Sequence, residues 1–258
     1  MHSKSFLEWQ GLVINTALAA TSALVALAFG LSTLDRWLRR GRRQDFAWTV
    51  AMALFGFASL ALWWAQARGW SDASFRIFFA LGAVINVPWL ALGTVYLLLG
   101  TRIGDIVGRW LLGLTGFSLG VILVAPLKGP VLSDEFPTAR NLFGVLPRIL
   151  AAVGSGVPAL IIFIGAMWSA VSLWRGKSPT ITTEATREVR SPRALATGNI
   201  LIALGTVVLS ASGTMAGRLG KDTAFVASLL AGISILFLGF LVATYATGVR
   251  PTRQNLII

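Results

Sequence analysis

The residues best suited to bind a ligand lie near the centre of a long apolar segment, FRIFFALGAVINVPWLALGTVYLLLG. Asn86 brings an amide that needs a hydrogen-bonding partner in apolar surroundings, and Trp89 brings a large ring with one N–H donor. Pro88 lacks a backbone N–H, which frees the carbonyl of Val84 and predicts a kink. Asn86 and Trp89 are therefore candidates for lining a pocket. The alternative is a packing kink whose Asn bonds a neighbouring helix.

A second apolar segment, LPRILAAVGSGVPALIIFIGAMWSAV, is interrupted by Gly154, Ser155, Gly156 and Pro158. Gly and Pro mark broken helices in some transporters, although they are also common in ordinary membrane spans. A third segment carries Ser210, which contacts either a ligand or a neighbouring helix. The candidate ligand-binding residues are Asn86, Trp89, Ser155 and Ser210, and the candidate kinks are Pro88 and Pro158.

The residues that are missing exclude most catalytic and cofactor chemistry. The chain has no cysteine and a single histidine, His2. Thiol chemistry, bis-histidine haem and multi-histidine metal sites are therefore excluded, and we expect no metal and no cofactor. All ten acidic residues fall in predicted loops or at span ends. A proton pump normally keeps at least one ionisable residue inside the membrane, so the sequence argues against that class of protein. The adjacent pair Asp134 and Glu135 is the only support for a surface enzyme.

These residues lie in a chain that is 55% hydrophobic and 12% charged, with the charges collected between long apolar segments. A typical soluble domain is about 25% charged. The pattern predicts an all-α, polytopic transmembrane helical bundle that forms a single domain over residues 1–258. Seven segments reach the roughly 20 residues needed to cross a bilayer. The predicted spans are 11–34, 46–67, 76–100, 107–126, 147–174, 194–217 and 223–248.

The distribution of positive charge predicts the orientation of these spans. Fourteen of the 22 Lys and Arg residues flank one side, including the cluster DRWLRRGRR, and eight flank the other. The positive-inside rule places the richer side in the cytoplasm, with the N-terminus outside and the C-terminus inside. The net charge of +12 therefore indicates contact with anionic membrane lipids, and we expect no nucleic-acid partner.

Pairs of small residues four positions apart are typical of closely packed membrane helices. They predict packing within the bundle, with contacts in a homo-oligomer as the alternative. The pairs are Gly116 and Gly120, Gly165 and Ser169, Ala194 and Gly198, Gly213 and Gly217, and Ala227 and Ala231.

The segments VINVPWLALGTVYLLLG and GNILIALGTVVL resemble a loosely defined group of uncharacterised seven-span prokaryotic membrane proteins. This resemblance implies a plasma (inner) membrane location and implies no activity. The leading hypothesis is a non-enzymatic protein that binds a lipid-like or apolar ligand, or acts as a sensor or as a subunit with a protein partner. The alternative is a permease or channel for a small neutral solute that uses carbonyls freed by Pro88 and Pro158.

Overall fold

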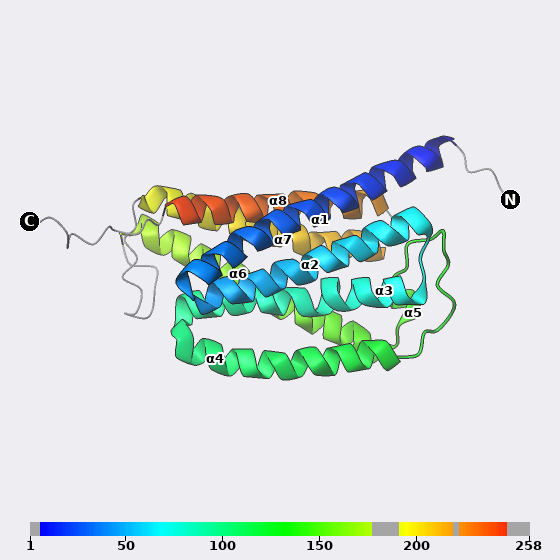
Figure 1. Ribbon diagram of the computed structural model, residues 1–258, viewed down its shortest axis with the longest axis horizontal. Coiled ribbons are helices and arrows are strands. Elements are labelled where there is room, and N and C mark those ends of the chain that lie inside the picture. Colours follow the sequence, from blue (N-terminus) through cyan, green and yellow to red (C-terminus); the bar gives the residue numbers. More distant parts are fainter. Residues whose placement is uncertain (1–5, 177–190, 219–221, 247–258) are drawn as a thin grey trace, which may run out of the picture.

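The computed structural model describes residues 6–176, 191–218 and 222–246 and is built from helices that run along one long axis (Figure 1). The helices are α1 (Phe6–Arg40), α2 (Arg43–Arg68), α3 (Asp72–Phe78), the π-helix η1 (Phe79–Ile85), α4 (Asn86–Val124), α5 (Ala139–Leu142), α6 (Val145–Trp174), α7 (Pro192–Arg218) and α8 (Asp222–Tyr245). Within the described ranges there is no strand, and Leu127 and Phe143 form an isolated β-bridge.

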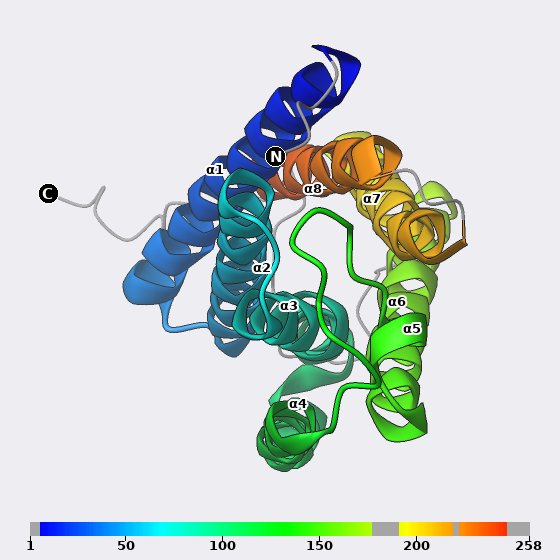
Figure 2. The same cartoon turned by 90° about the vertical axis from the view of Figure 1, so that its right-hand side faces the viewer.

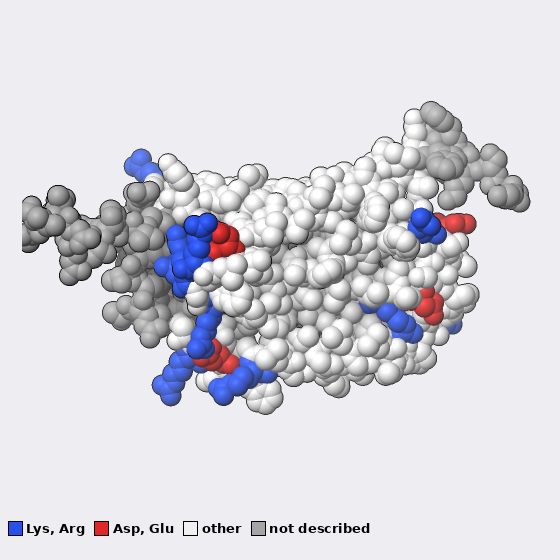
Figure 3. All heavy atoms as spheres, viewed as in Figure 1, with Lys and Arg blue, Asp and Glu red and all other residues white. Residues whose placement is uncertain are grey.

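Among the described residues, six helical stretches are long and apolar enough to cross a membrane. On the face shown in Figure 3, the charged side chains gather towards the two ends of the long axis and leave an uncharged band between them. The protein is therefore a multi-pass helical membrane protein, as its composition predicts.

One of the six stretches, Asp72–Val124, contains two antiparallel arms. Gly100 has a non-helical backbone, with φ 81° and ψ 179°, a conformation that glycine adopts readily. The hydrogen bond from Trp89 Nε1 to Thr115 Oγ1 (3.2 Å) and the one from the Tyr96 hydroxyl to Asp105 Oδ1 (3.0 Å) pair residues across this break. The chain consequently turns back at Gly100 (Figure 1).

This turn differs from the predicted boundary between the third and fourth spans. The segment 101–106 was expected to be a loop, but it is helical and only Gly100 departs from helical geometry. A single glycine is enough because the turn is held from outside. Arg43 of α2 forms an ion pair with Asp105, to which Tyr96 also donates.

Several helices extend beyond the predicted spans because polar residues continue or begin them. The start of α3 at Asp72 is four residues earlier than the predicted start at 76. Ser71 forms a capping box there, in which its side chain accepts from the Ser74 N–H and the Ser74 hydroxyl accepts from the Ser71 N–H. Hydropathy alone does not predict such polar caps, so it does not locate the start of this helix.

Helices α7 and α8 approach each other through glycine. A Cβ atom on Gly198 would lie 2.7 Å from the backbone nitrogen of Ala243, and one on Gly205 would lie 2.7 Å from that of Leu236. Gly165 packs on Leu98 in the same way. In contrast, a Cβ on Gly116 or Gly120 would have no neighbour within 4 Å, so that pair makes no packing contact within the described residues. The side chains at 213–217 lie outside the described residues.

The segment between α4 and α6 folds across one end of the bundle (Figure 2). Phe136 is its anchor, because its ring contacts Trp70, Phe78 and Phe225 at centroid distances of 5.2–6.1 Å. Trp70 also donates its backbone N–H to the carbonyl of Ser133 (3.0 Å). This segment thus closes the end of the bundle over a cavity.

Candidate functional site

A cavity of about 410 Å³ lies inside the bundle and is lined by residues of α2, α3, η1, α4, α5, α6, α7 and α8. Ligand pockets in proteins usually measure about 300–1,000 Å³. Three of the four side chains predicted to bind a ligand, Asn86, Ser155 and Ser210, line this one cavity from three different helices. Their convergence is a product of the tertiary fold, since they are distant in the sequence.

The fourth candidate, Trp89, lies elsewhere. Its side chain is buried and its Nε1 donates to Thr115 on the second arm of α4. Trp89 is not among the residues that line the cavity. It holds the two arms together, because the returning arm provides a hydroxyl at the position where the indole N–H needs a partner.

Asn86 is positioned by the π-helix η1, which ends directly before it. The Asn86 backbone N–H bonds to the carbonyl of Leu81, five residues earlier, and Pro88 follows without an N–H of its own. Single π-helical turns occur frequently at functional sites. The Asn86 side chain is only 5% exposed, and its Oδ1 accepts no hydrogen bond from any described residue. The residue thus borders the cavity, while its amide oxygen is enclosed in the wall without a partner among the described residues.

The hydroxyl groups opposite Asn86 are engaged as donors. Ser155 donates to the carbonyl of Ala151 (2.6 Å), and Ser210 donates to that of Thr206 (2.8 Å). Thr206, which also lines the cavity, donates to Ile202 in turn (2.8 Å). Each hydroxyl keeps lone pairs for a further bond. These three hydroxyls can therefore offer only lone pairs to a molecule in the cavity.

The remaining lining is apolar and rich in phenylalanine. Sequence reasoning missed this part, although Phe75, Phe78 and Phe79 recur at helical spacing and so share one face. It also missed Ser59 of α2, a 1% exposed residue in the lining. The only charged lining residue is Arg140, which is exposed on α5 at the end of the bundle.

The two predicted kinks occupy the helices beside the cavity. Pro88 lies in the first turn of α4 and Pro158 inside α6, which continues as one helix through it. The carbonyl oxygen of Val84, freed by Pro88, packs against α6 at Gly154.

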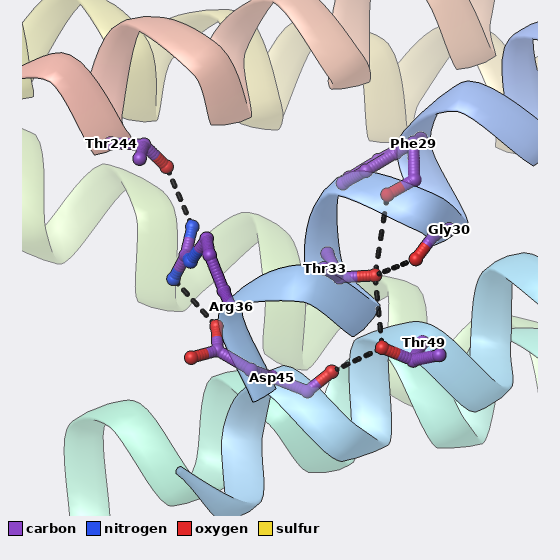
Figure 4. A network of polar contacts seen from close by, with 7 residues as sticks. All are labelled: Phe29, Gly30, Thr33, Arg36, Asp45, Thr49 and Thr244. Atoms are coloured by element: carbon purple, nitrogen blue, oxygen red, sulfur yellow. Dashed lines mark hydrogen bonds and ion pairs between the residues drawn. The ribbon is translucent and has the colours of Figure 1, made fainter. Parts of the chain in front are cut away.

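A second polar centre lies away from the cavity, where α1, α2 and α8 meet (Figure 4). Arg36 donates to Asp45 Oδ1 (2.5 Å) and to Thr244 Oγ1 (2.7 Å), and its guanidinium lies 4.6 Å from the centre of the Phe240 ring. Asp45 is fully buried. The sequence analysis counted Arg36 in the positive cluster that follows the first span, and it counted Asp45 among the acidic residues in loops or at span ends. The signal that could have revealed the ion pair is the short turn at Gly41, which lies between Arg36 and Asp45 in the sequence.

The Thr33 and Thr49 hydroxyls extend this network between α1 and α2. The single hydroxyl hydrogen of Thr49 is shared between Thr33 Oγ1 (3.0 Å) and the carbonyl of Asp45 (2.8 Å) (Figure 4). No residue of this network lines the cavity. Its contacts fasten three helices together, which is a structural contribution.

The acidic pair in the loop gains no catalytic geometry from the fold. Asp134 and Glu135 are exposed, and among the described residues Asp134 accepts only from the neighbouring Ser133 hydroxyl (3.2 Å). Within the described ranges no group of three or more His, Cys, Asp or Glu side chains lies close enough to hold a metal ion. The cavity is therefore the best candidate site.

Comparison with known proteins adds no name to this site: no family model, no curated protein and no solved structure matches the chain.

Proposed function

We propose that this protein is a non-enzymatic membrane protein that binds a lipid-like or apolar molecule in the cavity beside Asn86. The observation that carries the proposal is the largely apolar lining of the cavity, in which the polar residues Asn86, Ser155 and Ser210 come together from three helices. A few polar groups in an apolar pocket orient a ligand, whereas the apolar wall provides most of the binding free energy.

We further propose that the chain crosses the plasma membrane seven times, with its N-terminus outside. The antiparallel arms of Asp72–Val124 support two crossings there, and α1 begins at the end of the molecule opposite to that where α8 ends (Figure 1). The excess of Lys and Arg on one side supports the orientation. The loop that carries Phe136 and Arg140 would then face the outside.

A protein that binds this ligand without transporting it would act as a sensor or as a subunit of a membrane complex. The second arm of α4 supports contact with lipid or with a protein partner, because it exposes Trp110 (79%), Leu112 (59%) and Phe117 (55%). A binding event at Asn86 would reach this arm through Trp89, three residues further along α4.

A permease for a small neutral solute is the second candidate, and the prolines in two helices beside the cavity favour it. The sequence suggested that a permease would contact its solute through carbonyls freed by the prolines. The structure weakens this argument, because the carbonyl of Val84 packs against Gly154. Uptake of a neutral solute into proteoliposomes, abolished by filling the cavity, would favour the permease over a binding protein.

The test uses native mass spectrometry of the full chain, isolated gently from its own membrane. We expect one stoichiometric apolar molecule besides bulk lipid. Gly156 borders the cavity and an added Cβ would have no neighbour within 4 Å, so Gly156→Leu adds bulk at the cavity wall and should displace that molecule. Gly120→Leu is the matched control, since Gly120 has equally open space and lies away from the cavity. Bulk lipid alone, or equal occupancy in both variants, would contradict the proposal.

A further inference from the structure

The cavity is long and carries a single charged residue, which lies at one of its ends. We infer that its ligand is an anionic amphiphile with one alkyl chain, whose chain lies in the cavity and whose headgroup pairs with Arg140. This inference rests on the proposed function, because it specifies the ligand of the same cavity. It separates single-chain anionic lipids from neutral molecules of similar apolar size.

The first step of the argument is the length of the cavity. At the end of the bundle that the segment between α4 and α6 closes, the Phe136 ring contacts Phe225 of α8 at 5.2 Å, and both residues line the cavity. Leu236, eleven residues further along α8, also lines it, which adds about 16 Å at 1.5 Å per helical residue. One leaflet contributes about 15 Å to the hydrocarbon core of a bilayer. The cavity therefore has the length of one membrane acyl chain, and its volume of about 410 Å³ favours one chain over two.

The second step is that the polar groups along the cavity wall are poor partners for a charged headgroup. The hydroxyls of Ser155, Ser210 and Ser212 donate to carbonyls of their own helices at 2.6–2.8 Å, so their hydrogens are already used. The Asn86 Oδ1 atom is enclosed in the wall. A charged headgroup at this depth would lose its hydration and find no counter-ion, which is costly. The wall of the cavity thus suits an alkyl chain.

The third step is the charge at the end of the cavity. Arg140 on α5 is the only charged lining residue, and it is exposed. The three ion pairs within the described residues involve other arginines, so Arg140 has no carboxylate partner there. The acidic residues of the same segment, Asp134 and Glu135, do not line the cavity. A carboxylate or phosphate beside Arg140 would stay hydrated and would meet a planar guanidinium whose donors match its oxygens.

The experiment measures which lipid probes label the cavity. Photoreactive palmitic acid, with a diazirine near the end of its chain, is compared with its methyl ester, which has the same chain and no charge. Each probe is added at the same concentration to the full chain in phosphatidylcholine nanodiscs, at a mildly alkaline pH that keeps the acid ionised. After cross-linking by light, the labelled sites are mapped by mass spectrometry.

Labelling of cavity residues is divided by labelling of the exposed face around Leu112 and Phe117, which reports how much probe is in the lipid. We expect this ratio to be about twofold to fivefold higher for the acid than for the ester, because an exposed ion pair contributes modestly. The label should lie towards Leu236, since the headgroup at the other end directs the chain inwards.

A second pair of probes identifies the anionic group. Photoreactive lysophosphatidic acid carries a phosphate on one chain, and the monoacylglycerol with the same chain lacks this phosphate. A larger preference in the first pair would assign the site to a fatty acid, and a larger preference in the second pair would assign it to a phosphate-bearing lipid. Either result supports an anionic headgroup at Arg140.

The variant Arg140→Gln should lower both preferences to about one, because it removes the positive charge and keeps a polar side chain. Arg148→Gln is the matched control and should keep them. Arg148 is also exposed and lies in the first turn of α6, shortly after α5, but it does not line the cavity. Both substitutions are at exposed positions, and each preference compares ratios taken within one sample, so a modest loss of stability leaves them readable.

The outcomes separate the two proposals. If the charged and neutral probes of both pairs label the cavity equally in the unaltered protein, the cavity binds an alkyl chain without selecting its charge, and the inference is wrong while the proposed function stands. If no probe labels the cavity above the lipid-facing reference, both proposals are wrong. A preference that survives in Arg140→Gln, or that Arg148→Gln lowers to the same degree, would mean that the overall positive charge attracts the probes, and it would overturn the assignment to Arg140.

Discussion

The carbonyl oxygen of Val84 lies against the backbone of Gly154, so closely that a Cβ atom on Gly154 would be 2.8 Å from it. Each of these two residues precedes a proline by four positions, Pro88 in one helix and Pro158 in the other. Because proline donates no N–H, both helices lack an i→i−4 hydrogen bond at this point of contact. Asn86, two residues after Val84, and Ser155, directly after Gly154, line the cavity. The cavity is therefore bordered by two locally weakened helices that touch.

Gly154→Ala should destabilise the protein by about 1–3 kcal/mol, because the added methyl group meets a backbone oxygen that cannot move away alone. The measurement is the unfolding midpoint in nanodiscs, followed by intrinsic tryptophan fluorescence. Gly156→Ala is the control, since a Cβ there has no neighbour within 4 Å. Equal midpoints for the two variants would show that the contact at Val84 is loose.

Sequence analysis identified Asn86 and Pro88 in one predicted span and Ser155 and Pro158 in another, and it treated the two spans separately. Periodicity gives the face of a helix and not the neighbour that covers it, so it did not join them into one cavity. Trp89 illustrates the limit. It lies three residues after Asn86, close to the same helical face, yet the returning arm brings Thr115 to its Nε1 and occupies it.

The long apolar helices were predictable because apolar composition dictates them, and their ends were not. Ends depend on polar detail such as the Ser71 capping box and the positive φ of Gly100. The pair Arg36 and Asp45 was hidden for a related reason. Charge counting treats every arginine near a span end as facing lipid, whereas the turn at Gly41 brings these two together in a buried position.

Asp45→Asn should cost about 3 kcal/mol of stability, because it leaves the buried guanidinium of Arg36 without its carboxylate. The double variant Arg36→Met, Asp45→Leu should recover part of this loss, since an apolar pair needs no desolvation of charge. Asp35→Asn is the control, because Asp35 pairs with Arg39 at an exposed position, and its unfolding midpoint should change little. A midpoint in Asp45→Asn that matches this control would mean that the network contributes little.

Gly198→Ala should separate α7 from α8 and destabilise the protein by about 1–3 kcal/mol. A Cβ at this position meets the backbone nitrogen of Ala243 at 2.7 Å and the carbonyl oxygen of Gly239 at 2.8 Å. Gly120→Ala, which meets nothing within 4 Å, should be neutral or slightly stabilising, because alanine favours the helix. The comparison uses the same fluorescence measurement in nanodiscs, and destabilisation by both variants to the same degree would mean that helix propensity and not contact decides the effect.

Single cysteines test the seven crossings and their orientation, because the chain contains no cysteine of its own. Thr101 follows the turn at Gly100, and Leu132 lies exposed in the loop before α5. Thr101→Cys should react with a membrane-impermeant maleimide only when the cytoplasmic side is opened, and Leu132→Cys should react in intact cells. If Asp72–Val124 crossed the membrane once, the turn at Gly100 would lie within the bilayer and Thr101→Cys would stay unlabelled from both sides. Reversed labelling of the two positions would keep the seven crossings and invert the orientation, which would place the Phe136 segment and the adjacent end of the cavity in the cytoplasm.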